Sequence, residues 1–309
     1  MAYLRSLGVK FEINATLTRL NVAGGKISDA QITRADGSTE TVQADHHVLA
    51  VPLERAVPLL NDDILAIDPS LRTLRELSVD WMNGLMIYLK KPIDLAKGHV
   101  AYAAQPWALT STSQAQFWKE KFGTTYGDGN VNDCLSIDIS AWDVPGVIYR
   151  KPARDCTTEE IFNEVVEQLR RAIPFGRLRL TDSNIHSYFL DPAITGNGTP
   201  HVANDEPLLI NKPGSWYLRP EAATKVPNLF LASDYVKADI NLATMEGANE
   251  AGRKAANAVL EASGVSEPPA KLYKPWKPNV FKPLHDDDDA RFAAGKPNVF
   301  DIWDPHVPR

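Results

Sequence analysis

The sequence predicts a mixed α/β (α+β) fold, in which short strands and hairpins are combined with helices. Three observations predict it. Residues 9–52 alternate apolar and polar positions around tight turns, residues 157–173 repeat apolar positions every four residues, and residues 228–263 join a short apolar strand to a long helix. The 309 residues suffice for two domains or one large one, and their 44% hydrophobic and 23% charged content is ordinary for a globular protein.

The N-terminal elements follow from local signals. Tyr3 to Leu7 is typical of the end of a helix, with Gly8 in the position that terminates it. Val9, Phe11 and Ile13 then alternate as a strand. Asp-Gly at 36–37, between two alternating segments, favours a hairpin. We therefore expect a strand at 9–13, then a β-meander and a closing buried strand, with strands at 17–22, 27–34, 39–43 and 47–51.

The middle of the chain is predicted to mix both element types. The helix at Thr157–Ile173 is the clearest, because Thr157 or Thr158 is a good N-cap and Glu159 and Glu160 suit the first turn. The other expected elements are helices at 53–60 and 69–77, strands at 84–89 and 181–189, and loop-rich stretches at 92–150 and 191–223.

The C-terminal part holds a strand at 228–232 and a helix at 244–263 that Gly264 ends. From Ser266 the chain becomes rich in proline and lysine, which predicts an extended tail over 265–309 with an acidic run at 286–289. Two interpretations stay open: the tail wraps over the body, or it is an arm that binds a partner. Both depend on its aromatic residues, Tyr273, Trp276, Phe281, Phe292, Phe300 and Trp303.

Charge and composition exclude several classes of function. The net charge of −6 gives no basic field for nucleic acid. Cys134 and Cys156 fit neither a zinc spacing nor a disulfide framework, which predicts a reducing cytoplasm. The sequence has no signal peptide and no transmembrane run of about 18 apolar residues, which leaves only peripheral membrane contact open.

The segment 228–260 is the most informative for chemistry. Its apolar strand ends at Ser233 and Asp234, and its helix opens at Thr244–Ala248 after a loop. Ligands of open α/β sheets bind outside the carboxyl ends of strands. A helix start adds unpaired N–H groups and a positive partial charge, which stabilise an anionic group. Gly247 allows another group to approach the backbone closely. The segment therefore predicts a binding site for an electron-rich ligand.

This segment resembles the C-terminal FAD motif of the amine oxidase and phytoene (carotenoid) desaturase superfamily. The matching residues are Ala232-Ser233-Asp234, then Thr244-Met245-Glu246-Gly247-Ala248, then Gly252-Arg253 and Ala255-Ala256. Ser233 stands where the family usually has glycine. The meander with Val51-Pro52 and the middle stretches around Trp107, Trp142 and Trp216 resemble the same superfamily, so that the likeness covers about residues 1–264.

The resemblance implies roles for seven residues and a division of the chain. Asp234 is expected to bind the ribityl or pyrophosphate part of FAD, and the backbone of Met245, Gly247 and Ala248 is expected to face the flavin pyrimidine edge. Leu17 is expected to meet the adenine, and Thr244 and Glu246 belong to the same cofactor motif. The fold implied is an incomplete FAD-binding Rossmann-like domain plus a substrate domain with a mixed sheet and helices. Its parts are 1–52 and 224–264 for FAD, 53–223 for substrate, and the tail 265–309.

The G-x-G-x-x-G fingerprint of such enzymes is absent. The pairs Gly127-x-Gly129 and Gly196-x-Gly198 lack the third glycine and do not lie between a strand and a helix. In the family, about 200 residues are expected before Met1, a domain-sized unit. Three explanations stay open: a second polypeptide supplies the N-terminal FAD-binding half, the chain is a fragment, or it is a relic reused for binding.

Other reactive side chains have plainer interpretations. His46 and His47 are adjacent on a strand, point to opposite sides and cannot share a metal, so no metal site is predicted. His186 is expected to be a satisfied histidine within a strand, and the acidic run lacks calcium-loop spacing. Neither cysteine has an activating partner. The tryptophan-rich middle fits a core, or an apolar cavity for a long substrate.

The function that we predict is a flavin-dependent oxidoreductase, or the C-terminal half of one, in which hydride passes from an apolar substrate such as an isoprenoid or carotenoid to FAD. No catalytic residue is nominated. Amine oxidation and double-bond isomerisation stay open, because the superfamily hosts all of them. The alternatives from other classes are a non-catalytic subunit that binds a flavoprotein partner, and a lipid or carotenoid binder without redox chemistry.

Overall fold

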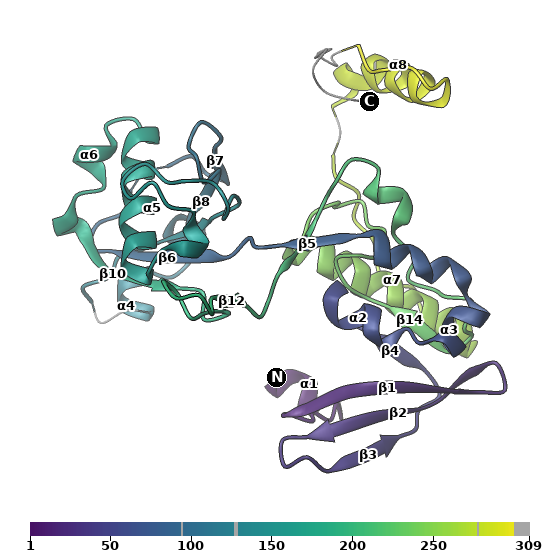
Figure 1. Cartoon of the computed structure of the whole chain (residues 1–309). Coiled ribbons are helices and arrows are strands. Elements are labelled where there is room, and N and C mark those ends of the chain that lie inside the picture. The colour runs from purple at the N-terminus through teal and green to yellow at the C-terminus, as the bar shows by residue number, and fades with distance from the viewer. Residues whose placement is uncertain (94, 127–128, 277, 300–309) are drawn as a thin grey trace.

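The structure is a computed structural model, which describes residues 1–93, 95–126, 129–276 and 278–299. Its helices and strands form two separate hydrophobic cores (Figure 1). The first core joins the N-terminal meander region to the C-terminal strand and helix, and the second core lies in the middle of the chain. The mixed α/β class predicted from the sequence is confirmed.

The N-terminal sheet is an antiparallel meander, as predicted. Helix α1 (Ala2–Ser6) precedes β1 (Ala15–Ala23), β2 (Lys26–Arg34) and β3 (Thr39–Val42), in the order β1-β2-β3. The strand expected at residues 9–13 is wrong, because no described strand pairs with that segment. Its side chains therefore lack a sheet to cover them, and Val9 and Ile13 stay 44% and 63% exposed.

A parallel strand pair forms the centre of the first core. Strand β4 (His47–Leu49) pairs with β14 (Leu229–Leu231), which is about 180 residues away in sequence. Asn228 fastens the meander to this pair, since its side-chain amide accepts from the Ile27 N–H and donates to the Ile27 carbonyl, both at 2.9 Å. The helices of this core are α2 (Leu53–Leu59), α3 (Asp62–Ile67), the 3₁₀ helix η1 (Pro69–Glu76) and α7 (Met245–Ser263).

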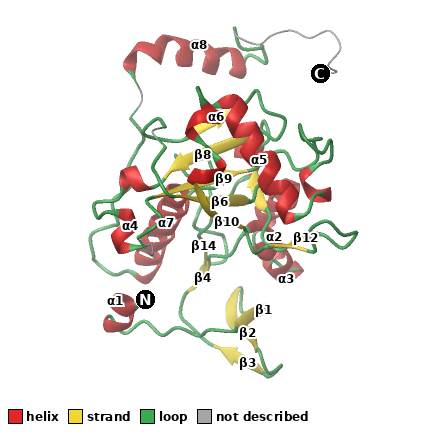
Figure 2. Cartoon of the chain, turned by 90° about the vertical axis from the view of Figure 1, so that its left-hand side faces the viewer, coloured by secondary structure: helices red, strands yellow, loops and turns green. Residues whose placement is uncertain are grey.

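The second core lies between an antiparallel sheet and helix α5 (Thr158–Ala172), as Figure 2 shows. The sheet has the order β10-β6-β9-β8-β7. Its strands are β6 (Gly84–Leu89), β7 (Val100–Tyr102), β8 (Leu109–Ser113), β9 (Asp133–Asp138) and β10 (Ile185–Leu190). Short elements complete this part: η2 (Ala115–Phe117), α4 (Phe122–Thr125), η3 (Ala153–Asp155), α6 (Gly176–Arg179), η4 (Asp182–Asn184), β11 (Ile194–Thr195) and β12 (Ala203–Asn204).

Helix α5 begins as the sequence predicts. Thr157 and Glu160 form a reciprocal capping box, in which each side chain accepts from the other residue's backbone N–H. One turn later, the fully buried Glu164 accepts hydrogen bonds from three consecutive N–H groups, of Val147, Ile148 and Tyr149, at 2.5–2.8 Å. This carboxylate fixes the 146–149 loop to the helix.

A two-stranded ribbon links the two cores. Strand β5 (Ser78–Asp80) pairs antiparallel with β13 (Leu208–Ile210), and Figure 1 shows this ribbon between the two parts. The cores divide the chain at different positions from the predicted boundaries of 53–223. Residues 53–77 and 209–223 belong with the first core, because the apolar faces of α2, α3 and η1 pack with Leu229 and Leu231 rather than with the second sheet.

The tail is only partly extended, which corrects the sequence prediction. Residues 282–293 form helix α8, which follows η6 (Asn279–Phe281). Pairs four residues apart, Lys282 with Asp286 and Arg291 with Asp287, support this exposed helix. Phe292 stacks on Tyr217 of η5 (Ser215–Leu218), with ring centroids 5.7 Å apart. Phe300 and Trp303, which the tail hypotheses also used, lie outside the described residues.

Candidate functional site

The predicted site begins at the carboxyl end of β14. The Ala232 N–H still donates to the Leu49 carbonyl at 3.0 Å, and the chain then turns, with the Val236 N–H bonded to the Ser233 carbonyl. The Ser233 hydroxyl donates to the half-buried Asp234 carboxylate at 3.2 Å. Asp234 thus stands at the strand end, the position where α/β sheets bind ligands.

A buried arginine holds this turn through a backbone carbonyl. Arg219 donates from Nη1 to the Asp234 backbone carbonyl at 2.9 Å and also bonds the Asn211 side chain. Burial lowers the pKa of Arg219, an effect that the nearby Asp234 charge opposes. The neighbouring Tyr235 is fully buried, and its hydroxyl has no hydrogen-bond partner among the described residues. The turn is therefore held by side chains that the sequence motif did not identify.

The start of α7 presents free backbone donors. Thr244 caps the helix, with Oγ1 accepting from the Gly247 N–H at 3.2 Å. Within the described chain, the N–H groups of Met245 and Glu246 have no acceptor, and the Met245 side chain is 86% exposed. Two free N–H groups at the positive end of a 19-residue helix are the donor set that the electron-rich edge of a flavin needs. The residues present therefore fit the expected cofactor.

Gly247 is needed here because the preceding loop packs against its backbone. A Cβ at this position would lie 2.8 Å from the Leu242 carbonyl oxygen and 3.3 Å from that of Ile240. The chain's own preceding loop, 235–243, therefore approaches the Gly247 backbone closely. Gly247 is buried beneath that loop, whereas Glu246 and Ala248 are exposed.

A carboxylate and an ammonium group hold the same loop on the helix. The buried Glu250 accepts from the N–H groups of Asp239 and Ile240, at 2.8 and 3.3 Å, and pairs with Lys254 at 3.2 Å. Lys254 also donates to the Lys237 carbonyl at 2.7 Å. Burial raises the pKa of Glu250, but these hydrogen bonds outweigh it and lower the pKa overall. The loop and the helix start consequently form one fixed unit.

Leu17 lies elsewhere in the first core, on a cavity of about 460 Å³. Glu54 of α2 lines the same cavity, and both of its carboxylate oxygens are buried without a hydrogen-bond partner among the described residues. The nearest cation is Arg55, 3.9 Å away. Burial raises the pKa of Glu54, and the charge of Asp234 raises it further. Leu17 and the unsatisfied Glu54 carboxyl group therefore line the same cavity.

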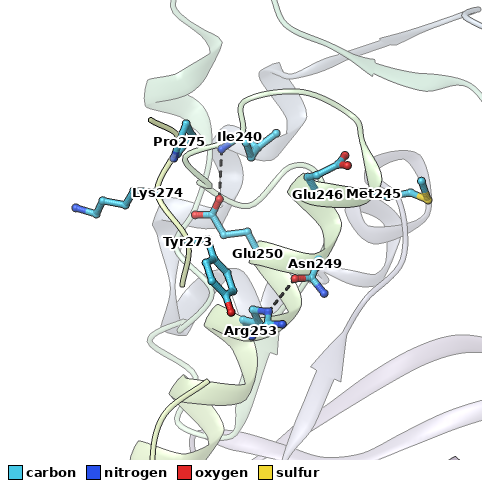
Figure 3. A pocket seen from close by; sticks show the side chains of 9 residues that line it. All are labelled: Ile240, Met245, Glu246, Asn249, Glu250, Arg253, Tyr273, Lys274 and Pro275. Carbon is cyan, nitrogen blue, oxygen red and sulfur yellow. Dashed lines mark hydrogen bonds between the residues drawn. The ribbon is translucent and has the colours of Figure 1, made fainter. Parts of the chain in front are cut away.

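A second cavity, of about 500 Å³, lies beside the start of α7 (Figure 3). Its helix side is formed by Met245, Glu246, Asn249, Glu250 and Arg253, and Ile240 of the preceding loop adds to it. The opposite side comes from Tyr273, Lys274 and Pro275 of the tail. The predicted residues Met245 and Glu246 therefore line a cavity distinct from the one at Leu17.

The remaining candidates do not form a site. His186 is exposed on β10 and hydrogen-bonded to the Ser187 hydroxyl, so it is a satisfied histidine within a strand, as expected. Cys134 and Cys156 are buried and unpaired, and burial raises the pKa of each thiol to about 12. Among the described residues no group of acidic, histidine and cysteine side chains could hold a metal ion. Trp107 and Trp142 are buried in the second core.

Sequence reasoning located the strand end and the helix cap but missed Glu54, Arg219, Tyr235 and Glu250. Of these, only Glu250 could have been found from the sequence. Glu250 and Lys254 are four residues apart on a helix, a spacing that favours pairing. The partners of the other three come from distant segments. The structure also has, within its described part, no helix long and apolar enough to cross a membrane.

Comparisons with known proteins find similar sequences and structures. A probable zeta-carotene desaturase from Synechococcus elongatus is 32% identical over 109 residues, 35% of this chain and 19% of the relative's length. The structure of an oxidoreductase from Methanosarcina mazei aligns with TM-score 0.43 and 10% identity, over 76% of this chain and 46% of the other chain. The structure of a flavoprotein/dehydrogenase from Cytophaga hutchinsonii aligns with TM-score 0.41 and 11% identity, over 95% of this chain and 59% of the other chain.

The family described as flavin containing amine oxidoreductase matches residues 1–260, which is most of the chain. This match confirms the superfamily resemblance and the flavin cofactor, FAD, that the motif predicted. It ends before the tail, so the segment from residue 261 onward has no counterpart in the matched region. The chain belongs to the flavin containing amine oxidoreductase family.

Proposed function

We propose that this chain is the flavin-edge and substrate-binding part of an FAD-dependent oxidoreductase that accepts hydride from an apolar substrate. When bound, FAD supplies the hydride acceptor. The chain's own contribution is to position the cofactor through Asp234 and the α7 start, and to stabilise negative charge with the helix end.

The observation that carries the proposal is the pair of free N–H groups at Met245 and Glu246. They stand at the capped start of α7, behind a loop that Glu250 and Lys254 hold in place. A preorganised donor set of this kind is more effective than one that must rearrange when charge develops. Asp234 at the adjacent strand end supplies the acceptor for hydroxyl groups of the cofactor.

The experiment is an absorbance spectrum of the purified chain between about 300 and 550 nm, after incubation with FAD and desalting. Retained bands near ~370 and ~450 nm, the region of oxidised flavin absorption, support the proposal. Asp234→Asn is expected to weaken retention, and Asp239→Asn, which is exposed on the neighbouring loop, is the matched control. A chain that stays colourless after incubation with excess FAD and desalting would rule out independent flavin binding.

Binding to a second polypeptide is the other candidate, and a specific observation favours it. The side chains of Tyr3, Leu4, Leu7, Val9 and Ile13 are all exposed in one N-terminal segment. Exposed apolar groups gathered in this way are typical of a surface that another chain covers. We propose a partner that supplies the N-terminal FAD-binding half, in the cytoplasm, where the two free cysteines stay reduced.

Co-expression with a domain that carries G-x-G-x-x-G distinguishes the two candidates. A complex that acquires flavin bands, when neither chain does so alone, supports a split enzyme. If the complex forms without flavin, the chain is a binding subunit. If this chain is yellow by itself, the partner is not needed for cofactor binding.

A further inference from the structure

The tail segment 270–275, which we call the strap, is fastened along α7. Asn257 holds its first residue by two hydrogen bonds: its Nδ2 donates to the Ala270 carbonyl at 3.0 Å, and its Oδ1 accepts from the Ala270 N–H at 2.6 Å. A side-chain amide that satisfies both groups of one residue fixes the position and direction of the chain there.

Arg253 continues the attachment one turn closer to the helix start. It donates to the Lys271 carbonyl at 3.0 Å, and its guanidinium lies 5.6 Å from the centre of the Tyr273 ring. Asn249 accepts from the Arg253 Nε at 2.8 Å and so orients the guanidinium group. Lys271 approaches the same ring, at 4.8 Å. Two cations near the ring hold it in place, although Tyr273 is 62% exposed.

The strap thereby closes one side of the 500 Å³ cavity at the α7 start. Figure 3 shows the Tyr273 ring beside Arg253 and Glu250, across from the side of Ile240 and Glu246, whereas Lys274 points away. Without the strap this face of α7 would be an open surface, since the strap residues supply the wall opposite the helix. The family match ends at residue 260, so this wall lies outside the matched region.

We propose that the strap is a lid on the flavin-edge site, with Tyr273 as the residue that slows the release of a planar heteroaromatic ligand bound against the Met245 and Glu246 N–H groups. This inference rests on the proposed function. The lid covers bound ligand and excludes water from the helix end, and it lowers the rate of dissociation more than it alters the rate of association.

The test is the dissociation constant and dissociation rate of FAD, followed by flavin fluorescence, for the full chain and four variants. Tyr273→Ala and Asn257→Ala are expected to weaken binding about tenfold, mainly through faster release. Tyr273→Phe keeps the ring and is expected to bind as the parent does. Tyr217→Ala removes the ring on which Phe292 stacks and leaves the strap untouched, so it is the matched control.

Each outcome bears on a different statement. FAD binding that is equal in all five forms overturns the lid and leaves the proposed function standing. If no form binds FAD, independent flavin binding by this chain is ruled out and the lid fails with it, whereas the co-expression experiment decides the split enzyme. Because Tyr273 lies on the surface, its replacement by alanine does not threaten the fold, and far-ultraviolet circular dichroism checks this in the same samples.

Discussion

At the scale of single residues, Glu54 is a carboxyl group in an unfavourable position. Its oxygens are shielded from solvent, they accept no hydrogen bond among the described residues, and Arg55 is too far away for more than a weak ion pair. Burial raises the pKa of Glu54. Folding therefore favours the protonated form, and that contribution to stability is present below the unfolded pKa and is lost as pH rises through the folded pKa.

We expect Glu54→Gln to stabilise the folded chain at pH 7 by about 1 kcal/mol, because the variant removes a poorly solvated charge. Near pH 4 the difference from the parent should shrink, because Glu54 is then protonated. Urea unfolding at the two pH values measures this, and Glu120→Gln on an exposed loop is the control. A variant that is less stable at pH 7 would mean that the charged carboxylate has a favourable partner.

Gly247 and Gly252 give a matched pair of substitutions on α7. A Cβ at Gly247 would press against the Leu242 carbonyl, so Gly247→Ala is expected to cost about 1–3 kcal/mol and to weaken FAD binding by moving the loop. A Cβ at Gly252 meets nothing within 4 Å, so Gly252→Ala is expected to add about 0.5–1 kcal/mol of stability. Thermal unfolding and FAD titration of both variants test this, and equal effects would contradict it.

Single residues were predictable from sequence where the signal is local. Thr157, Thr244 and Gly264 act at helix ends as expected, because capping depends on neighbours within a few residues. Gly247 was singled out as a point of close approach, and the preceding loop makes such a contact there. The sequence shows that a position requires glycine, whereas the group that approaches it depends on how the loop folds.

At the scale of elements, the Glu164 carboxylate is the main link between α5 and the 146–149 loop. Glu164→Gln would place an amide NH₂ against backbone N–H donors, so we expect a loss of about 2–3 kcal/mol. Denaturant unfolding of this variant measures the loss. Glu159→Gln, on an exposed position of the same helix, is expected to change little. Similar stabilities for the two variants would show that the link is dispensable.

Most elements with a clear period were predicted within two residues, and the failures have physical causes. Residues 9–13 alternate as a strand should, but a strand also needs a neighbour, which no described segment provides. Helix α3 follows its Asn61 cap over only six residues, too few to show a helical period. Helix α8 lacks an apolar face, so only its ion pairs distinguish it from an extended tail.

At the scale of the whole molecule, the β5–β13 ribbon and the adjoining chain join the two cores. We therefore expect two unfolding transitions in differential scanning calorimetry. Glu164→Gln should lower only the transition of the second core, and Asn228→Ala, which frees Ile27 from β14, only that of the first. A single transition that both substitutions shift alike would show that the cores unfold together.

The arrangement of the candidate site was predictable only in part at this scale. The strand–loop–helix of 228–263 is contiguous, so its geometry followed from its own sequence. Arg219 reaches Asp234 from a segment outside that motif, and the strap reaches α7 from the tail. Such contacts depend on tertiary packing, which periodicity along the chain does not report.

The pairing of β4 with β14 also has a consequence for the order of events during synthesis. The second core is built from one continuous stretch and can form as soon as that stretch has left the ribosome. The first core must wait, because residues 47–49 find their partner only after residue 231 has emerged. Until then the meander and α2 stay exposed on the nascent chain. A chaperone that binds apolar segments can therefore bind these residues for longer than those of the second core.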